Sequence, residues 1–133
     1  MILGSGEHRY KVVEKWAQLP EGWEFKDVAA VACDRQDRVH VFNRGEHPNL
    51  GPRLSIVDRE GKLIARLGGE HGPGLESGRF IAPHGLAVDS RGDIYVGEVS
   101  YTEFARLYPE RSIAFRMRSL QKLVKVARKE DPQ

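Results

Sequence analysis

One segment of this 133-residue chain occurs twice, and the repetition constrains the fold more than any other feature. Residues 25–42 align with residues 80–97 at an offset of 55 positions. Each copy has a short apolar run, a turn led by an aspartate, and then an apolar–polar alternation, which is typical of a β-hairpin. We therefore predict two hairpins and a repeat architecture. The matched pairs include Phe25 with Phe80, Val31 with Leu86, Asp34 with Asp89, and Val41 with Val96.

Further segments have the composition of strands. Residues 54–58 and 62–67 flank a short turn, and alternation returns in residues 120–126. Residues 10–16 predict one more strand near the start of the chain. The pattern fails between residues 100 and 119, where we expect a packed loop with a helical turn. That loop carries the apolar residues Phe104, Leu107, Tyr108, Ile113 and Phe115.

The predicted strands make two four-stranded units with one strand exchanged. The first unit, about residues 25–68, has its four strands, whereas the second, about residues 80–126, lacks its outermost one. The strand at residues 10–16 precedes the first unit and has no unit of its own. We expect residues 1–133 to form a single all-β domain, in which this strand completes the last unit of another copy.

Two longer matches give the repeat a family likeness. FIAPHGLAVDSRGDIYVGEV at residues 80–99, with SIVDREGKLIARLG at residues 55–68, resembles the NHL repeat of six-bladed β-propellers. VACDRQDRVHVFNRGEH at residues 31–47 and APHGL at residues 82–86 are similar to the propeller lyases that cleave peptidyl-α-hydroxyglycine to a peptide amide and glyoxylate, and to their bacterial relatives. The likeness covers about residues 10–126. It implies two four-stranded blades in each chain.

The resemblance assigns candidate site residues position by position. In the lyases an arginine of a Phe-x-Arg-Gly segment faces the substrate, and here that residue is Arg44. The histidine of Pro-His-Gly binds zinc, and here it is His84. Tyr101 lies slightly displaced from the position of the catalytic tyrosine. Backbone carbonyls matching Val31 and Leu86 hold a structural calcium ion on the axis of the ring.

The number of blades leads to a prediction of self-assembly. Two blades alone leave two apolar sheet faces uncovered. Each uncovered face forfeits roughly 10 kcal/mol of hydrophobic stabilisation, whereas the total free energy of unfolding of a domain is about 5–15 kcal/mol. A head-to-tail contact that closes gives a ring, so three copies of this chain supply six blades as a homotrimer. The lyases take zinc histidines from three blades, whereas Ala29 stands where His84 would recur here. A trimer brings three His84 side chains around one zinc ion. The alternative is a fragment that does not fold stably.

Composition narrows the choice of partner and compartment. Lys and Arg number 21 against 19 Asp and Glu, a net charge of +2, which disfavours nucleic acid and anionic membranes as partners. No segment approaches the ~20 apolar residues that span a bilayer, and residues 1–7 lack the apolar run of a secretory signal. We expect a cytoplasmic protein. Cys33, the only cysteine, is predicted to be a buried core residue.

Several polar residues keep two interpretations at this stage. Arg44 either orients a carboxylate or carbonyl in the channel, or forms a salt bridge with Glu46 or Asp27. Glu98 is either a channel carboxylate or a residue of the blade rim. His40 alternates with apolar residues and is predicted to face the neighbouring sheet.

Three functions fit these expectations. The first is a lyase-like enzyme or metal-binding module, in which zinc polarises a hydroxyl or carbonyl group while Arg44 orients an acidic group of the substrate. The second is a scaffold that binds a small acidic or peptide ligand, since a fold does not fix a function. The third is an inactive fragment of a longer propeller.

Overall fold

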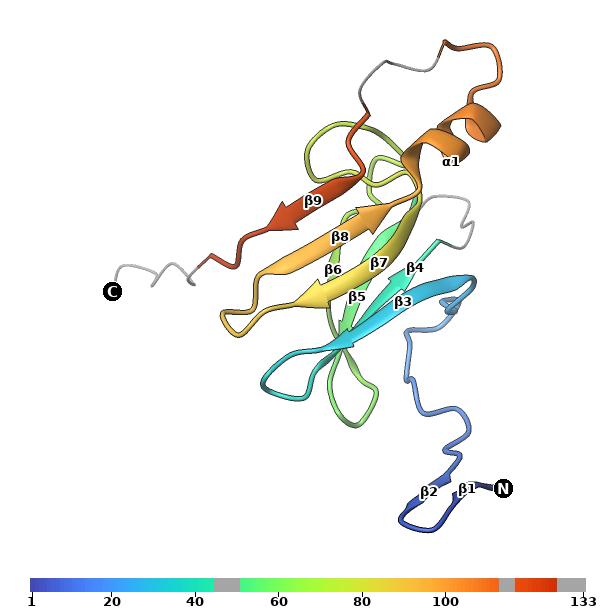
Figure 1. The fold of residues 1–133 in the computed structure, drawn as a ribbon, viewed down its shortest axis with the longest axis vertical. Coiled ribbons are helices and arrows are strands. Elements are labelled where there is room, and N and C mark those ends of the chain that lie inside the picture. Colours follow the sequence, from blue (N-terminus) through green and yellow to red (C-terminus); the bar gives the residue numbers. More distant parts are fainter. Residues whose placement is uncertain (45–50, 113–116, 127–133) are drawn as a thin grey trace.

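The computed structural model describes residues 1–44, 51–112 and 117–126. This part of the chain is all-β apart from one short helix, as predicted, and its strands form three antiparallel sheets (Figure 1). None of the three sheets closes on itself. In the described ranges, no helix is both long and apolar enough to cross a membrane.

The first large sheet has four strands in chain order. They are β3 (Val28–Cys33), β4 (Val39–Asn43), β5 (Arg53–Val57) and β6 (Leu63–Leu67). Successive side chains of a strand point to opposite faces, so one row across the sheet faces the second sheet. That row is Ala30, Phe42, Leu54 and Leu67.

The second large sheet has three strands among the described residues. They are β7 (Pro83–Val88), β8 (Ile94–Glu98) and β9 (Leu120–Leu123). β9 is shorter than the predicted strand of residues 120–126. Where we expected a loop with one helical turn, α1 (Ser100–Leu107) follows β8. Its Phe104 packs with Ile81, Ala82 and Met117 in a second small core, while Ile113 and Phe115 lie outside the described residues.

The main core lies between the two large sheets. β3 and β7 lie side by side, and the chief apolar cluster joins the sheets through Phe42, Leu54, Phe80, Ile94 and Val96. The rings of Phe42 and Phe80 meet edge to face, with centroids 4.9 Å apart. Between the outer strands β6 and β9 a groove of about 630 Å³ remains open. The two sheets therefore diverge from β3 and β7 toward β6 and β9.

The internal repeat is reproduced in the strand positions and in individual hydrogen bonds. β3 and β7 begin at residues 28 and 83, and β4 and β8 at residues 39 and 94, in each case 55 residues apart. The aspartates cap their turns as predicted, since Oδ1 of Asp34 and of Asp89 each accept two backbone N–H bonds. Asn43 and Glu98 are also repeat equivalents. Oδ1 of Asn43 accepts a hydrogen bond from the Lys26 N–H, and Oε1 of Glu98 accepts one from the Ile81 N–H. The two units share one folding pattern.

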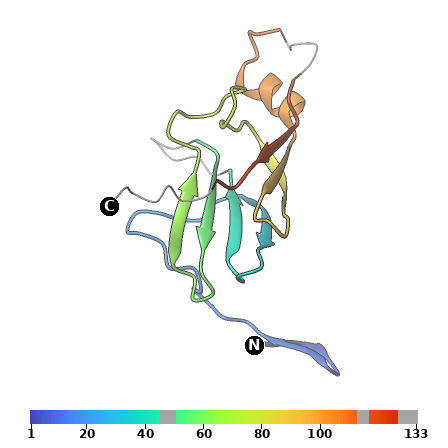
Figure 2. The ribbon, with the colours of Figure 1, turned by 90° about the vertical axis from the view of Figure 1, so that its left-hand side faces the viewer.

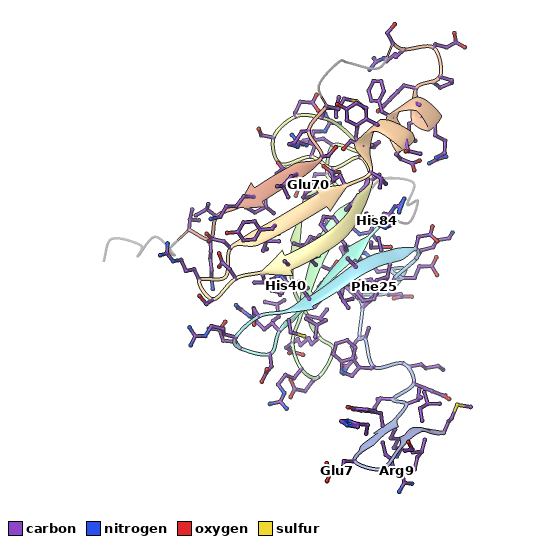
Figure 3. The ribbon with its side chains drawn as sticks, viewed as in Figure 1. Glu7, Arg9, Phe25, His40, Glu70 and His84 are labelled. Carbon is purple, nitrogen blue, oxygen red and sulfur yellow. The ribbon has the colours of Figure 1, made fainter. Side chains whose placement is uncertain are left out.

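The predicted strand at residues 10–16 is wrong in its bounds. The strand is β2 (His8–Lys11), which pairs with β1 (Ile2–Ser5), a strand that we did not expect. A two-residue turn joins them, and Gly6 has a φ of 56° there, which suits the first position of a tight hairpin turn. Residues 12–16 form no strand, although the Val12 N–H donates to the Met1 carbonyl at the end of this pair. The hairpin instead projects from the body, with Glu7 and Arg9 far from the large sheets (Figures 2 and 3).

The prediction that Cys33 is buried is also wrong. Ala30 and Ala32 of β3 are half-buried on the face toward the second sheet, which turns Val31 and Cys33 to the opposite face. Val31 is 60% exposed, and Cys33 is exposed as well. His40 is buried and lines the groove between the sheets, where its Nε2 lies 3.1 Å from Oδ2 of Asp34.

Because the Asp34 carboxylate is stabilised in the folded chain, we expect the free energy of unfolding to fall in acid. Burial alone would raise the pKa of Asp34, but hydrogen bonds from His40 and Arg38 outweigh it and lower this pKa to about 2. Since the pKa is lower in the folded state, the carboxylate stabilises the fold above about pH 4 and loses this effect as the pH falls through about 2. We expect Asp34→Asn to lower the free energy of unfolding by about 2 kcal/mol at pH 6 and by little at pH 2.

Urea unfolding between pH 6 and pH 2 measures this difference. Asp58→Asn is the matched control, because Asp58 caps the β5–β6 turn with the same pair of backbone bonds but only at the surface. An Asp34→Asn variant as acid-sensitive as the wild type would contradict the assignment.

Candidate functional site

The fold brings together Arg44 and His84, two residues that the sequence pointed to from separate units. Arg44 directly follows β4, and His84 is the second residue of β7 (Figure 3). These strand ends meet because β4 runs back along β3, and β3 lies beside β7. Arg44 Nη1 lies 3.4 Å from His84 Nδ1. A guanidinium only donates, so Nδ1 accepts this hydrogen bond.

A carboxylate from α1 completes the cluster. Oε2 of Glu103 lies 3.8 Å from Arg44 Nη2, and its Oε1 pairs with Nε of Arg106. The ion-pair partner of Arg44 is therefore Glu103 rather than Asp27, which gives only its backbone carbonyl to the Arg44 N–H. Glu46, the other expected partner, lies outside the described residues. Sequence reasoning missed Glu103, although an acidic residue in the first helical turn and an arginine three residues later are a helix signal.

Glu98 holds the chain just before His84. Its buried Oε1 accepts the backbone N–H of Ile81 at 2.7 Å and that of Ala82 at 3.2 Å. Oε2 lies 3.8 Å from Nη2 of Arg118. The carboxylate thus lies in the interior, neither in an open channel nor on the rim, and it fixes where β7 begins.

Tyr101 lies at the start of α1, near the same end of the sheets. Its hydroxyl accepts a hydrogen bond from the backbone N–H of Met117 at 3.0 Å, and its side chain is 43% exposed. This contact ties α1 to the chain that returns toward β9. A catalytic role for Tyr101 stays a prediction.

Val31 and Leu86 occupy equivalent positions on β3 and β7, as the repeat predicted. Their side chains differ in environment, because Leu86 packs against the main core while Val31 is exposed. The calcium ion that the resemblance implies for their carbonyl groups stays a prediction.

One chain by itself does not fit a zinc site. Within residues 1–44, 51–112 and 117–126, no three His, Cys, Asp or Glu side chains are placed to hold a metal ion. Because Nδ1 of His84 accepts from Arg44, the neutral ring carries its proton on Nε2. Coordination through Nε2 would move that proton to Nδ1, against a guanidinium that can only donate. A shared zinc ion would require Arg44 to leave His84.

The pair as arranged offers hydrogen-bond donors to an anion. The unused N–H groups of Arg44 and the Nε2–H of the exposed His84 are suited to a carboxylate, which accepts two bonds from a planar fork. Among the described residues of the cluster, two guanidinium groups, those of Arg44 and Arg106, share the single carboxylate of Glu103. The cluster has a net positive charge.

Comparison with known proteins adds no relative. The chain matches no protein-family model and no curated protein sequence. The likeness to NHL propellers therefore rests on the residues quoted above.

Proposed function

We propose that this chain is a two-blade propeller module that closes a ring with copies of itself and binds a small carboxylate-bearing ligand. The contact of Arg44 with His84 carries the proposal, because it joins two blades at one end of their innermost strands. Both side chains have donors left for an anion. Three such pairs around one channel would give it a positive potential that attracts acidic ligands.

The exposed faces of the two sheets support assembly. Gly85 and Gly97 lie opposite each other on the outer face of the second sheet, and a Cβ atom at either would meet nothing within 4 Å. Gly97 stands at the repeat position of Phe42, whose ring receives Phe80 inside the chain. Phe25, the repeat equivalent of Phe80, is only half-buried. A second copy can place its Phe25 in the hollow over Gly97, as Phe80 packs on Phe42.

Light scattering tests this assembly. We expect the mass of three chains, since the family likeness implies six blades, and we expect Gly97→Arg to reduce it to one chain by filling the hollow with a charge. Ser90→Arg, in the exposed β7–β8 turn, is the matched control and should leave the mass unchanged. A wild-type chain that is folded and monomeric at micromolar concentration would rule out the ring.

Calorimetric titration with glyoxylate and with N-acetylglycine tests the ligand class. Arg44→Gln is expected to weaken binding about tenfold, the effect of one hydrogen bond between charged groups. Glu103→Gln should strengthen binding, because it removes the carboxylate that competes for Arg44. Equal affinity in all three proteins would contradict the proposal.

Metal analysis of the same samples separates this function from the lyase-like alternative. One tightly held zinc ion per three chains, lost in His84→Ala, would assign His84 to metal and would overturn its role as a donor to the carboxylate. In that case the release of glyoxylate from a peptidyl-α-hydroxyglycine becomes the activity to measure.

A further inference from the structure

The groove between the two large sheets has the form of a vacant strand position. Its lining combines apolar residues with charged ones such as Arg38 and Arg66, and along one side runs the chain from Leu123 to Val126. Among the described residues β9 pairs only with β8, so no described strand pairs with its other edge. In the first sheet the corresponding place beside β5 is taken by β6. The apolar part of the lining includes Ile56, Leu67, Phe80, Ile94 and Leu123.

The repeat identifies the strand that belongs there. β2 begins at residue 8 and β6 at residue 63, which are 55 residues apart. The same spacing separates β3 from β7 and β4 from β8. β2 is therefore the repeat equivalent of β6, the outermost strand of a four-stranded blade. It precedes the first blade of its own chain and so belongs to the blade before it.

We infer that β2 of one copy adds to the free edge of β9 in the next copy and fills this groove. The inference rests on the proposed ring, in which the blade before β3 is the second sheet of a neighbouring chain. Edge addition satisfies the backbone groups of β9 through a ladder of main-chain hydrogen bonds.

The register of the new pair follows from the first sheet. Val39 pairs with Val57, and its equivalent Ile94 pairs with Leu123, so β9 corresponds to β5 residue by residue. Transferring the pairing of β5 with β6 to β9 with β2 places His8 opposite Leu123 beyond a register shift, and gives three further cross-strand pairs in continuous register. They are Val12 opposite Leu120, Lys11 opposite Gln121, and Tyr10 opposite Lys122.

The exposure of these residues agrees with such a pairing. Leu120 is 68% exposed, Tyr10 67% and Val12 43% in the isolated chain. Within the part of the chain that the structure describes, β2 pairs only with β1, and all its residues are exposed. Its other edge is available to β9. In this register Tyr10 and Val12 lie with Leu120 on the outer face of the second sheet, the face of Gly97, and Lys11 faces the groove.

Site-specific disulfide formation tests the register. Val12→Cys and Leu120→Cys chains, both with Cys33→Ser because Cys33 is exposed, are mixed and oxidised with copper phenanthroline. We expect a disulfide-linked pair of chains on a non-reducing gel. Lys11→Cys mixed with Leu120→Cys is the matched control, and it should give no such band because the side chain of residue 11 points to the other face.

The outcome separates this inference from the proposed function. A chain with the mass of three copies but no Val12–Leu120 disulfide would overturn the strand exchange and leave the ring standing. Monomeric chains that form no disulfide would overturn both. A disulfide within one chain carrying both cysteines at high dilution would show that the strand folds back in cis, and would overturn the exchange between copies.

Discussion

Phe80→Ala is expected to lower the free energy of unfolding by about 3–5 kcal/mol, the cost of removing a fully buried aromatic ring from a core. Phe80 is 1% exposed, contacts Phe42 edge to face, and belongs to the only large apolar cluster that joins the two sheets in the described residues. The total free energy of unfolding of a small domain is about 5–15 kcal/mol. The variant should therefore be largely unfolded near 37 °C, as followed by circular dichroism during urea and thermal unfolding.

Phe25→Ala is the matched control, because the repeat places the same residue type in the same position of the other blade. Phe25 is half-buried in the single chain, so this change should cost about 1 kcal/mol when the protein is dilute, a typical cost for a point substitution. At concentrations where a ring forms, we expect the two variants to lose stability to a similar extent. Equal and small losses in both variants at all concentrations would contradict the packing described for Phe80.

Glu98→Ala is expected to lower the free energy of unfolding by about 3 kcal/mol and to shift His84 in the candidate site. The change leaves the Ile81 and Ala82 N–H groups buried without an acceptor and removes the carboxylate beside Arg118. Because Ile81 and Ala82 lead directly into β7, His84 should shift with them. Urea unfolding measures the first effect, and the histidine signals in a ¹H–¹⁵N spectrum measure the second.

Glu98→Gln keeps an acceptor oxygen for both N–H groups and should recover most of the lost stability. Glu110→Ala, on the exposed surface after α1, is the control and should change the stability by less than about 0.5 kcal/mol. If Glu98→Gln is as unstable as Glu98→Ala, the charge beside Arg118 matters more than the backbone hydrogen bonds, and the role assigned to Oε1 is wrong.

Local signals were sufficient to predict most strands. Asp34 and Asp89 each begin a turn whose backbone N–H groups they cap, and the runs on either side alternate as a half-buried strand must. Periodicity and turn chemistry act over a few residues, so they can be read from the sequence. The same reasoning failed for residues 10–16 because the bounds of a strand depend on its partner, and the partner of β2 in this chain is β1.

The candidate site was predictable only in part. Arg44 and His84 were singled out by their neighbours in the chain, and the repeat placed them at strand ends. Their contact depends on β3 lying beside β7, which no local pattern specifies. Glu103 was missed because its partner Arg44 is distant in sequence, and only the position of α1 brings them together.

The sequence by itself determined the repeating unit: its length of 55 residues, its aspartate-led turns and its alternating strands. The tertiary structure decided which faces are covered. It buried the side chain of Phe80, left that of Phe25 half-buried, and left those of Val31 and Cys33 exposed to solvent. The repeat alone would make the two units equivalent. The physical reason is that hydrogen bonding within a strand pair is satisfied locally, whereas apolar burial requires a second surface. Each unit finds that surface only in a neighbouring unit, and the described residues contain one such apolar contact between the large sheets.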